Sequence, residues 1–209
     1  MTDTTTRKIT VVSSGLSQPS STRLLADRIS AATVAALEGK GITAEVTVIE
    51  LRDLAQDITN NLLTGFAPPK LEAAITAVTE SDGLIAVTPI FTTSYSGLFK
   101  SFVDVLDPQS IHGLPVLLGA TGGTERHSLA IDYAMRPLFT YLHAVPVPTG
   151  VYAASSDWGS TDDGSLVDRI DRGAAELAAL AADSDRSSRV RDPFELPAGF
   201  SPVGGFGAQ

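Results

Sequence analysis

The sequence predicts an α/β fold in which helices cover both faces of a five-stranded parallel sheet. Segments rich in β-branched residues alternate along the chain with amphipathic segments, which is the pattern of repeated strand–helix–strand units. Residues 83–88 are apolar almost throughout, as expected for a parallel strand buried on both faces. Crossovers between parallel strands are right-handed, so the intervening helices lie on the two faces of the sheet. A chain of 209 residues is long enough for one such domain with a substantial core.

The first half of the chain supplies three of the expected strands and two helices. A short β-branched run, residues 9–12, leads into a loop of serine, glycine and proline. A helix is expected from Arg23 to about Gly39, where glycines provide the signal of a helix end. The remaining expectations are a strand at residues 44–50, a long connection at 51–69, a helix at 70–81 and the buried strand at 83–88. So long a connection is typical of a lid or an interface loop.

The second half repeats this order and ends in a segment of different composition. It predicts a loop at residues 89–95, a helix at 96–106, a strand at 115–120, a loop at 121–124, a helix at 125–143, a strand at 145–153 and a helix at 166–182. Pro137 is expected to kink or break its helix, and Pro146 and Pro148 restrict the start of the last strand to an edge position. We therefore expect a single domain at residues 1–182. Residues 183–209 are interpreted either as a disordered tail or as an arm that clasps a neighbouring subunit.

Composition excludes several classes of function. The formal net charge is −9, whereas a nucleic-acid partner requires clustered lysine and arginine. There is no cysteine, which excludes disulfides, thiolate catalysis and zinc–sulfur sites, and the three histidines lie too far apart for a metal site. No apolar run is long enough to span a membrane, and the first residues lack a signal-peptide core. We therefore expect a cytoplasmic protein with no metal, no nucleic-acid partner and no membrane partner.

Three loops rich in serine, threonine, glycine and proline follow the first, third and fourth expected strands. They comprise residues 13–22, 89–95 and 121–124. The carboxyl ends of parallel strands meet at one edge of the sheet, which is where open α/β folds bind their ligands. The first loop also leads into a helix N-terminus, whose free N–H groups and positive dipole favour an anion. The sequence therefore predicts an anion site built from three loops at this edge.

Missing motifs restrict the identity of that anion. Residues 13–17 (SSGLS) lack the Gly-x-Gly-x-x-Gly spacing of a dinucleotide site, and no Walker lysine follows the first loop. Without those glycines, Glu50 at the end of the second strand is interpreted as a solvated strand end rather than a ribose-binding acid. Hydroxyl donors at a helix N-terminus suit a phosphate monoester. Flavin mononucleotide (FMN) on a doubly wound, flavodoxin-like sheet with strand order 2-1-3-4-5 fits this description.

Two segments resemble the NAD(P)H-dependent FMN reductases. Residues 88–100 (TPIFTTSYSGLFK) are similar to the Thr-Pro-x-aromatic and Ser-Gly-x-x-Lys segment of that family. Residues 120–124 (ATGGT), followed by His127, the run at 130–134 and Pro137, look like the third loop and helix of one branch. That branch supplies reduced flavin to two-component monooxygenases. The first loop departs from the family pattern, because the early arginine is absent and Pro19 is additional.

The resemblance implies a set of cofactor-binding residues and no general acid–base pair, since the flavin carries the chemistry. It assigns the FMN phosphate to Ser14, Ser17, Ser20, Ser21 and Thr22. It assigns the ribityl chain and the ring edge to Pro89, Ile90, Phe91 and Thr92, and the pyrimidine end to Thr121, Gly122, Gly123 and Thr124. Tyr133 is interpreted as helix core or subunit packing within reach of a neighbour's flavin, and Trp158 as either a surface lid or a core residue.

The function that the resemblance implies is hydride transfer from NADPH or NADH to FMN, with reduced FMN passed to a partner monooxygenase. Two alternatives share the fold: a quinone or azo reductase that retains its flavin, and a flavodoxin-type electron carrier without pyridine-nucleotide activity. The carrier is disfavoured because its typical Thr-x-Thr-Gly-x-Thr loop is absent. The family also implies a homodimer or homotetramer.

Overall fold

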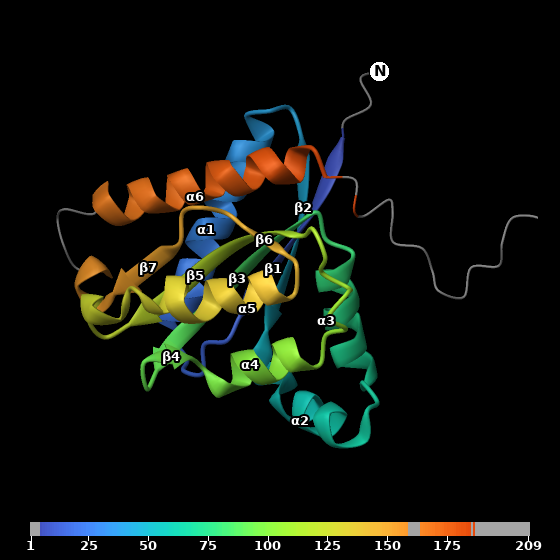
Figure 1. Cartoon of the computed structure of the whole chain (residues 1–209). Coiled ribbons are helices and arrows are strands. Elements are labelled where there is room, and N and C mark those ends of the chain that lie inside the picture. Colours follow the sequence, from blue (N-terminus) through green and yellow to red (C-terminus); the bar gives the residue numbers. More distant parts are fainter. Residues whose placement is uncertain (1–4, 159–163, 185, 187–209) are drawn as a thin grey trace, which may run out of the picture.

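A seven-stranded and largely parallel sheet forms the centre of the molecule (Figure 1). The computed structural model describes residues 5–158, 164–184 and 186. The strands are β1 (Thr6–Ser13), β2 (Thr43–Glu50), β3 (Gly83–Phe91), β4 (Ser94–Tyr95), β5 (Pro115–Gly122), β6 (Val145–Pro146) and β7 (Val151–Ala154). Their order is β2-β1-β3-β5-β6, with β7 also paired to β5 and β4 paired to β3. Every pair is parallel except the β3–β4 hairpin.

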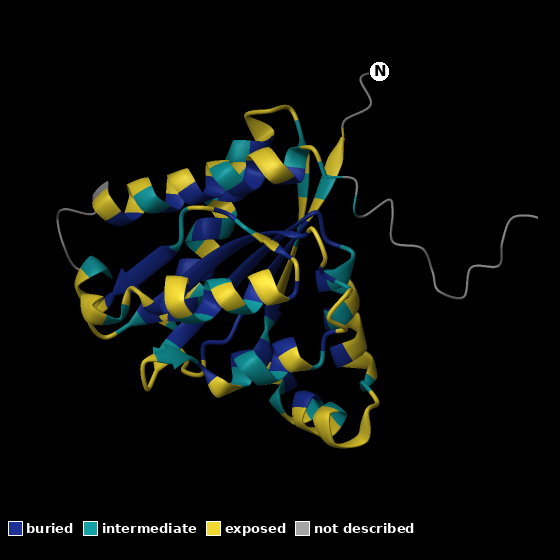
Figure 2. Cartoon of the chain, viewed as in Figure 1, coloured by how far each residue is buried: buried dark blue, intermediate teal, exposed yellow. Residues whose placement is uncertain are grey.

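Helices cover both faces of this sheet, so the inner strands β3 and β5 are buried in the middle layer, whereas the edge strand β2 is mostly exposed or half-buried (Figure 2). The helices are α1 (Ser21–Glu38), α2 (Ala55–Thr64), α3 (Pro69–Thr79), α4 (Gly97–Asp104), α5 (Arg136–Tyr141) and α6 (Gly164–Ala182). Apolar residues of α1 and α6 form one core cluster, and those of α2 to α5 form the other. Within the described ranges, no helix combines the length and the apolar composition needed to cross a membrane.

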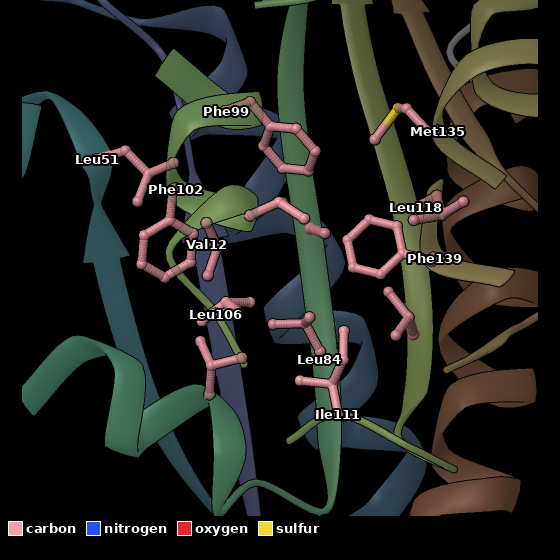
Figure 3. Close-up of a cluster of buried hydrophobic side chains, with 14 of the residues drawn as sticks. Val12, Leu51, Leu84, Phe99, Phe102, Leu106, Ile111, Leu118, Met135 and Phe139 are labelled. Atoms are coloured by element: carbon pink, nitrogen blue, oxygen red, sulfur yellow. The ribbon is translucent and has the colours of Figure 1, made fainter. Parts of the chain in front are cut away.

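Side chains along β1 point alternately to the two faces of the sheet, so this strand contributes residues to both clusters. Val11 packs into the cluster on the α1 and α6 side, whereas its neighbour Val12 packs into the cluster on the opposite face. Figure 3 shows Val12 on that second face among Phe99, Phe102 and Phe139. The ring of Phe99 lies 5.9 Å from that of Tyr95 and 6.2 Å from that of Phe139, measured between centroids. These aromatic contacts hold α4 and α5 against the sheet.

The predicted α/β class is confirmed, but the expected number of five strands is wrong. The last strand is split into β6 and β7, which pair with the start and the end of β5. Pro148 lies between them and has no N–H to donate, so the ladder is interrupted there. The other strand that was not expected is β4. It pairs antiparallel with β3 after a turn at Thr92 and Thr93, which both have positive φ. A strand of two residues is too short to show an alternation of apolar and polar residues in the sequence.

Two expected segments have a different secondary structure. The connection at residues 51–69 contains a 3₁₀ turn (Leu51–Leu54) and α2, which buries Ile58. The single helix expected at residues 125–143 is instead a 3₁₀ turn (Glu125–His127), a π-helical turn (Ile131–Met135) and α5. The N–H of Arg136 donates to the carbonyl of Ile131, five residues earlier, immediately before Pro137. Because proline cannot donate, the wider turn accommodates the break that Pro137 predicts.

Arg186 fastens the chain after α6 to the edge of the sheet where the parallel strands begin. Its guanidinium donates to the carbonyl oxygens of Thr79 (3.1 Å), Ser110 (2.8 Å) and His112. Burial lowers the pKa of Arg186, and the charge of Asp82 opposes that shift. Most of the segment interpreted as a tail or arm, residues 187–209, lies outside the described residues.

We expect Arg186→Met to lower the free energy of unfolding by about 1–2 kcal/mol, because three carbonyl groups lose a donor while the aliphatic stem is kept. Urea unfolding followed by circular dichroism measures the change. Arg172→Met, an exposed position on α6, serves as the control. Equal unfolding midpoints for the two variants would contradict this role for Arg186.

Candidate functional site

The three small-residue loops meet at the carboxyl edge of the sheet and enclose a cavity of about 400 Å³. The first loop contributes the N-terminus of α1, the second the end of β3, and the third the end of β5. The lining consists of Leu16, Ser17, Ser21, Thr22, Pro89, Ile90, Phe91, Thr121, Gly122, Gly123, Ser155 and Trp158. None of these described lining residues carries a charge.

The N-terminus of α1 presents hydrogen-bond donors to this cavity. Ser20 is the N-cap, and its hydroxyl accepts from the N–H of Arg23 at 3.2 Å. The N–H groups of Ser21 and Thr22 precede the first intrahelical bond and therefore have no partner within the helix. The first turn of α1 contains no acidic residue that would compete for them. Helix dipole and free donors together make this end of the cavity suitable for an anion.

Gly15 allows the first loop to fold back onto this cap. A Cβ atom at Gly15 would lie 2.0 Å from the hydroxyl oxygen of Ser20 and 3.2 Å from Cβ of Thr22. Any side chain at this position would therefore displace the capping serine. The glycine is required by close approach rather than by a positive φ.

The third loop also depends on a close approach, between Gly122 and Tyr152. A Cβ atom at Gly122 would lie 2.0 Å from the hydroxyl oxygen of Tyr152. That hydroxyl donates to the carbonyl of Thr124 at 2.6 Å and so holds the loop against β7. Burial raises the pKa of Tyr152, and the charge of Asp157 adds to the effect.

Tyr152 should make the protein less stable in alkaline solution. Because its pKa is higher in the folded state than the ordinary value of about 10, its contribution is complete below that pH and is lost as the pH rises through the folded-state pKa. Urea unfolding at about pH 8 and about pH 11 measures this loss. We expect a smaller decline for Tyr152→Phe than for the unchanged protein, and identical declines would contradict the assignment.

Buried hydroxyl groups connect the three loops beneath the cavity. The hydroxyl oxygens of Thr22 and Thr121 lie 2.8 Å apart and link the first loop to the third. Ser96, the N-cap of α4, donates to the hydroxyl of Ser14 at 3.3 Å and accepts from the N–H of Phe99. The N–H of Ser96 donates in turn to the hydroxyl of Thr88 at 3.0 Å. The second loop is thereby tied to the first by fully buried groups.

The structure brings nine of the thirteen predicted site residues to the cavity lining. The other four are Ser14, Ser20, Thr92 and Thr124, which lie outside the lining. Ser14 is fully buried in the hydroxyl network, Ser20 caps α1, Thr92 is in the hairpin turn, and Thr124 accepts from the N–H of Arg126. Their predicted contacts with the cofactor remain predictions.

Three lining residues are absent from the predicted set: Leu16, Ser155 and Trp158. Ser155 and Trp158 belong to a fourth connection, a 3₁₀ turn (Ser155–Trp158) directly after β7. The sequence does contain a signal for this fourth loop: residues 153–156 (AASS) are a small-residue segment at the end of a strand, like the three predicted loops. The splitting of the last strand concealed where it ends.

Charged groups near the first loop neutralise one another. Glu50 is not a solvated strand end, because its carboxylate pairs with Arg23 at 2.6 Å and with Arg52 at 3.1 Å. The pKa of Arg23 is raised, first by its hydrogen bond to Asp27 and further by Glu50. Arg52 also donates to the carbonyl of Ser17 at 3.3 Å. Arg52 thus links the carboxylate of Glu50 to the backbone of the first loop.

A second cavity of about 460 Å³ lies beside the third loop and has a different character. Its lining includes the acidic residues Glu125, Asp132 and Asp157, with Arg169 as the basic one. Asp157 and Arg169 form an ion pair at 3.8 Å. Three carboxylates repel a phosphate, so this cavity is a poor candidate for the anion site. Among the described residues, no group of three or more histidine, aspartate or glutamate side chains could hold a metal ion.

The parallel sheet, the uncharged cavity at its carboxyl edge and the helix N-terminus beside it define a flavodoxin-like α/β protein whose cavity suits a phosphorylated ligand. Comparison with known proteins identifies the family. The model of a family described as NADPH-dependent FMN reductase matches residues 7–159, and the chain belongs to this family. The predicted resemblance is confirmed, as is the expectation of an oxidoreductase that uses FMN and a nicotinamide.

Relatives and solved structures agree with this family. The chain is 38% identical over 151 residues to an FMN reductase (NADPH) from Pseudomonas aeruginosa, covering 72% of this chain and 78% of that protein. It is 39% identical over 174 residues to the NADH-dependent FMN reductase SfnF from Pseudomonas fluorescens, covering 82% and 90%. An oxidoreductase structure from Corynebacterium diphtheriae superimposes with a TM-score of 0.83 at 46% identity, covering 86% of this chain and 98% of that one.

The residues present fit FMN. An uncharged lining with free N–H groups at one end accepts a phosphate without a competing carboxylate. Gly123 has open space where a Cβ atom would stand, which leaves room for its backbone N–H to approach a flat ring. Ile90, Phe91 and Trp158 provide apolar surface for that ring.

Proposed function

We propose that this chain oxidises NADPH or NADH, transfers the hydride to FMN in the cavity of about 400 Å³, and supplies the reduced flavin to a two-component monooxygenase. The proposal rests chiefly on the convergence of the three loops around an uncharged lining in a chain of this family. Relatives whose names state NADPH and NADH dependence are both similar to the chain, so either nicotinamide is a candidate donor.

In this proposal the chain binds and orients while the cofactor supplies the redox chemistry, since the flavin accepts the hydride. Ser21 and Thr22, with the adjoining Ser17, hold the phosphate. Pro89, Ile90 and Phe91 lie along the ring, and Thr121, Gly122 and Gly123 contact its pyrimidine end. Ser14, Ser20, Thr92 and Thr124 support these segments from outside the lining. The residues from 1 to 182 act as one domain, in the cytoplasm.

Exposed apolar side chains before α5 and at the β3–β4 hairpin support a homodimer or homotetramer. Leu129 and Tyr133 are 61% and 79% exposed on the segment before α5, and Phe91 is 48% exposed at the hairpin. A second copy on this face would cover these side chains and line the nicotinamide side of the cavity. Light scattering tests the proposal, which a single-chain mass would contradict.

Steady-state assays test the function. We expect the oxidation of NADPH or NADH to depend on added FMN. The rate should be lower when a quinone replaces FMN as the acceptor. Faster turnover with a quinone would favour a quinone reductase, and flavin binding without nicotinamide oxidation would favour an electron carrier. The proposal fails if FMN stimulates the oxidation of neither nicotinamide.

A further inference from the structure

Trp158, the chain's single tryptophan, lines the cavity from outside the three predicted loops. It ends the 3₁₀ turn after β7 and packs partly against the apolar cluster under α1 and α6. The indole is the largest apolar surface in the lining, and nothing in the family resemblance assigns it a role. A large aromatic side chain with one part in the core and one part facing a ligand cavity suits a binding wall.

The indole itself makes one polar contact, and a second contact closes the turn that carries it. The guanidinium carbon of Arg28, on α1, lies 5.1 Å from the centroid of the ring, within the range of a cation–π contact. The carboxylate of the preceding residue, Asp157, accepts from the N–H of Ala154 at 2.7 Å and closes the turn. The first contact joins the indole to α1, and the second joins its turn to the end of β7.

The contact with Arg28 places Trp158 along α1, two helical turns from Ser21. Ser21 and Arg28 are seven residues apart and therefore share one side of α1. Ser21 lies in the first turn, where the free N–H groups face the cavity. Trp158 lines the same cavity as Ser21, so its indole adds apolar surface to the lining beside α1. Lower local polarity strengthens hydrogen bonds to a bound phosphate.

We propose that Trp158 is a fourth binding element for FMN, in contact with the cofactor at the phosphate end of the cavity, and that Arg28 is its positioning residue. This inference rests on the proposed binding of FMN in this cavity. Replacing the indole by a methyl group removes that apolar surface. Replacing it by a phenyl ring keeps most of it.

Titration of FMN fluorescence with the purified protein tests the proposal. We expect Trp158→Ala to raise the Kd for FMN about tenfold, the size of a lost aromatic contact, and Trp158→Phe to stay within about threefold of the unchanged protein. Arg28→Met should raise the Kd by a smaller factor, because the indole remains but loses its support. Tyr141→Ala is the control, since Tyr141 is 77% exposed at the C-terminus of α5. For Trp158→Ala and Arg28→Met, we expect a higher KM for FMN and a smaller change in kcat at saturating FMN. A general structural defect would lower kcat as well.

A second measurement does not depend on the folding of any variant. Protein labelled with 5-fluorotryptophan has one ¹⁹F resonance, because there is one tryptophan. We expect this resonance to shift as FMN saturates the protein. An unmoved resonance, or an unchanged Kd in folded Trp158→Ala, would overturn the proposal. If the unchanged protein fails to bind FMN at all, the proposed function itself is wrong.

Discussion

The double variant Ser21→Ala, Thr22→Val is expected to raise the Kd for FMN about 100-fold while leaving the Kd for riboflavin within about threefold. Hydrogen bonds to a charged group contribute about 1.5–3 kcal/mol each, and Ser21 lies at the anion-binding end of the cavity, while the hydroxyl of Thr22 is buried directly behind it. Riboflavin lacks the phosphate, so it reports any damage to the rest of the site. Thr22→Val also removes the bond of 2.8 Å to Thr121 and leaves that hydroxyl without its partner.

Fluorescence titration with the two flavins measures this difference, and Thr33→Val is the matched control. Thr33 is a buried threonine on the same helix whose hydroxyl donates to the carbonyl of Ile29, away from the cavity. Equal losses of FMN and riboflavin affinity would show that the phosphate is held elsewhere.

Gly122→Ala is expected to raise the Kd for FMN about 30-fold without unfolding the protein. The added methyl group would lie 2.0 Å from the hydroxyl of Tyr152, so the tyrosine must move and lose its bond to the carbonyl of Thr124. Losing a buried hydrogen bond and displacing the third loop together correspond to about 2 kcal/mol. The same titration measures the loss, with circular dichroism to confirm the fold.

A second substitution separates the clash from any other effect of the alanine. Tyr152→Phe removes the oxygen nearest to the new methyl group, although the ring carbon at 3.1 Å remains. The double variant should therefore recover part of the affinity lost in Gly122→Ala. An affinity that falls further in the double variant would contradict this explanation.

The sequence was sufficient for the features that are local or periodic. The apolar run that became β3 and the serine-rich entry to α1 predict the α/β class and the edge that carries the site. Because parallel strands end at one edge, the convergence of the loops follows from topology without any side-chain detail. Nine of the predicted residues accordingly lie in the lining.

The features that were missed depend on contacts between distant residues. The pairing of β6 and β7 with one neighbour, β5, allows a strand to be interrupted at Pro148 and resumed. Trp158 reaches the cavity because Arg28, 130 positions earlier, holds it against α1. Glu50 is enclosed by two arginines from different elements. No pattern within a short window of sequence reports such neighbours.

A crystal structure of the protein soaked with FMN would show directly which cavity holds the flavin. We expect density for one FMN per chain in the cavity of about 400 Å³, with its phosphate at the N–H groups of Ser21 and Thr22 and its ring beside Phe91 and Gly122. Density for the flavin in the acidic cavity between Glu125 and Arg169 instead would contradict it.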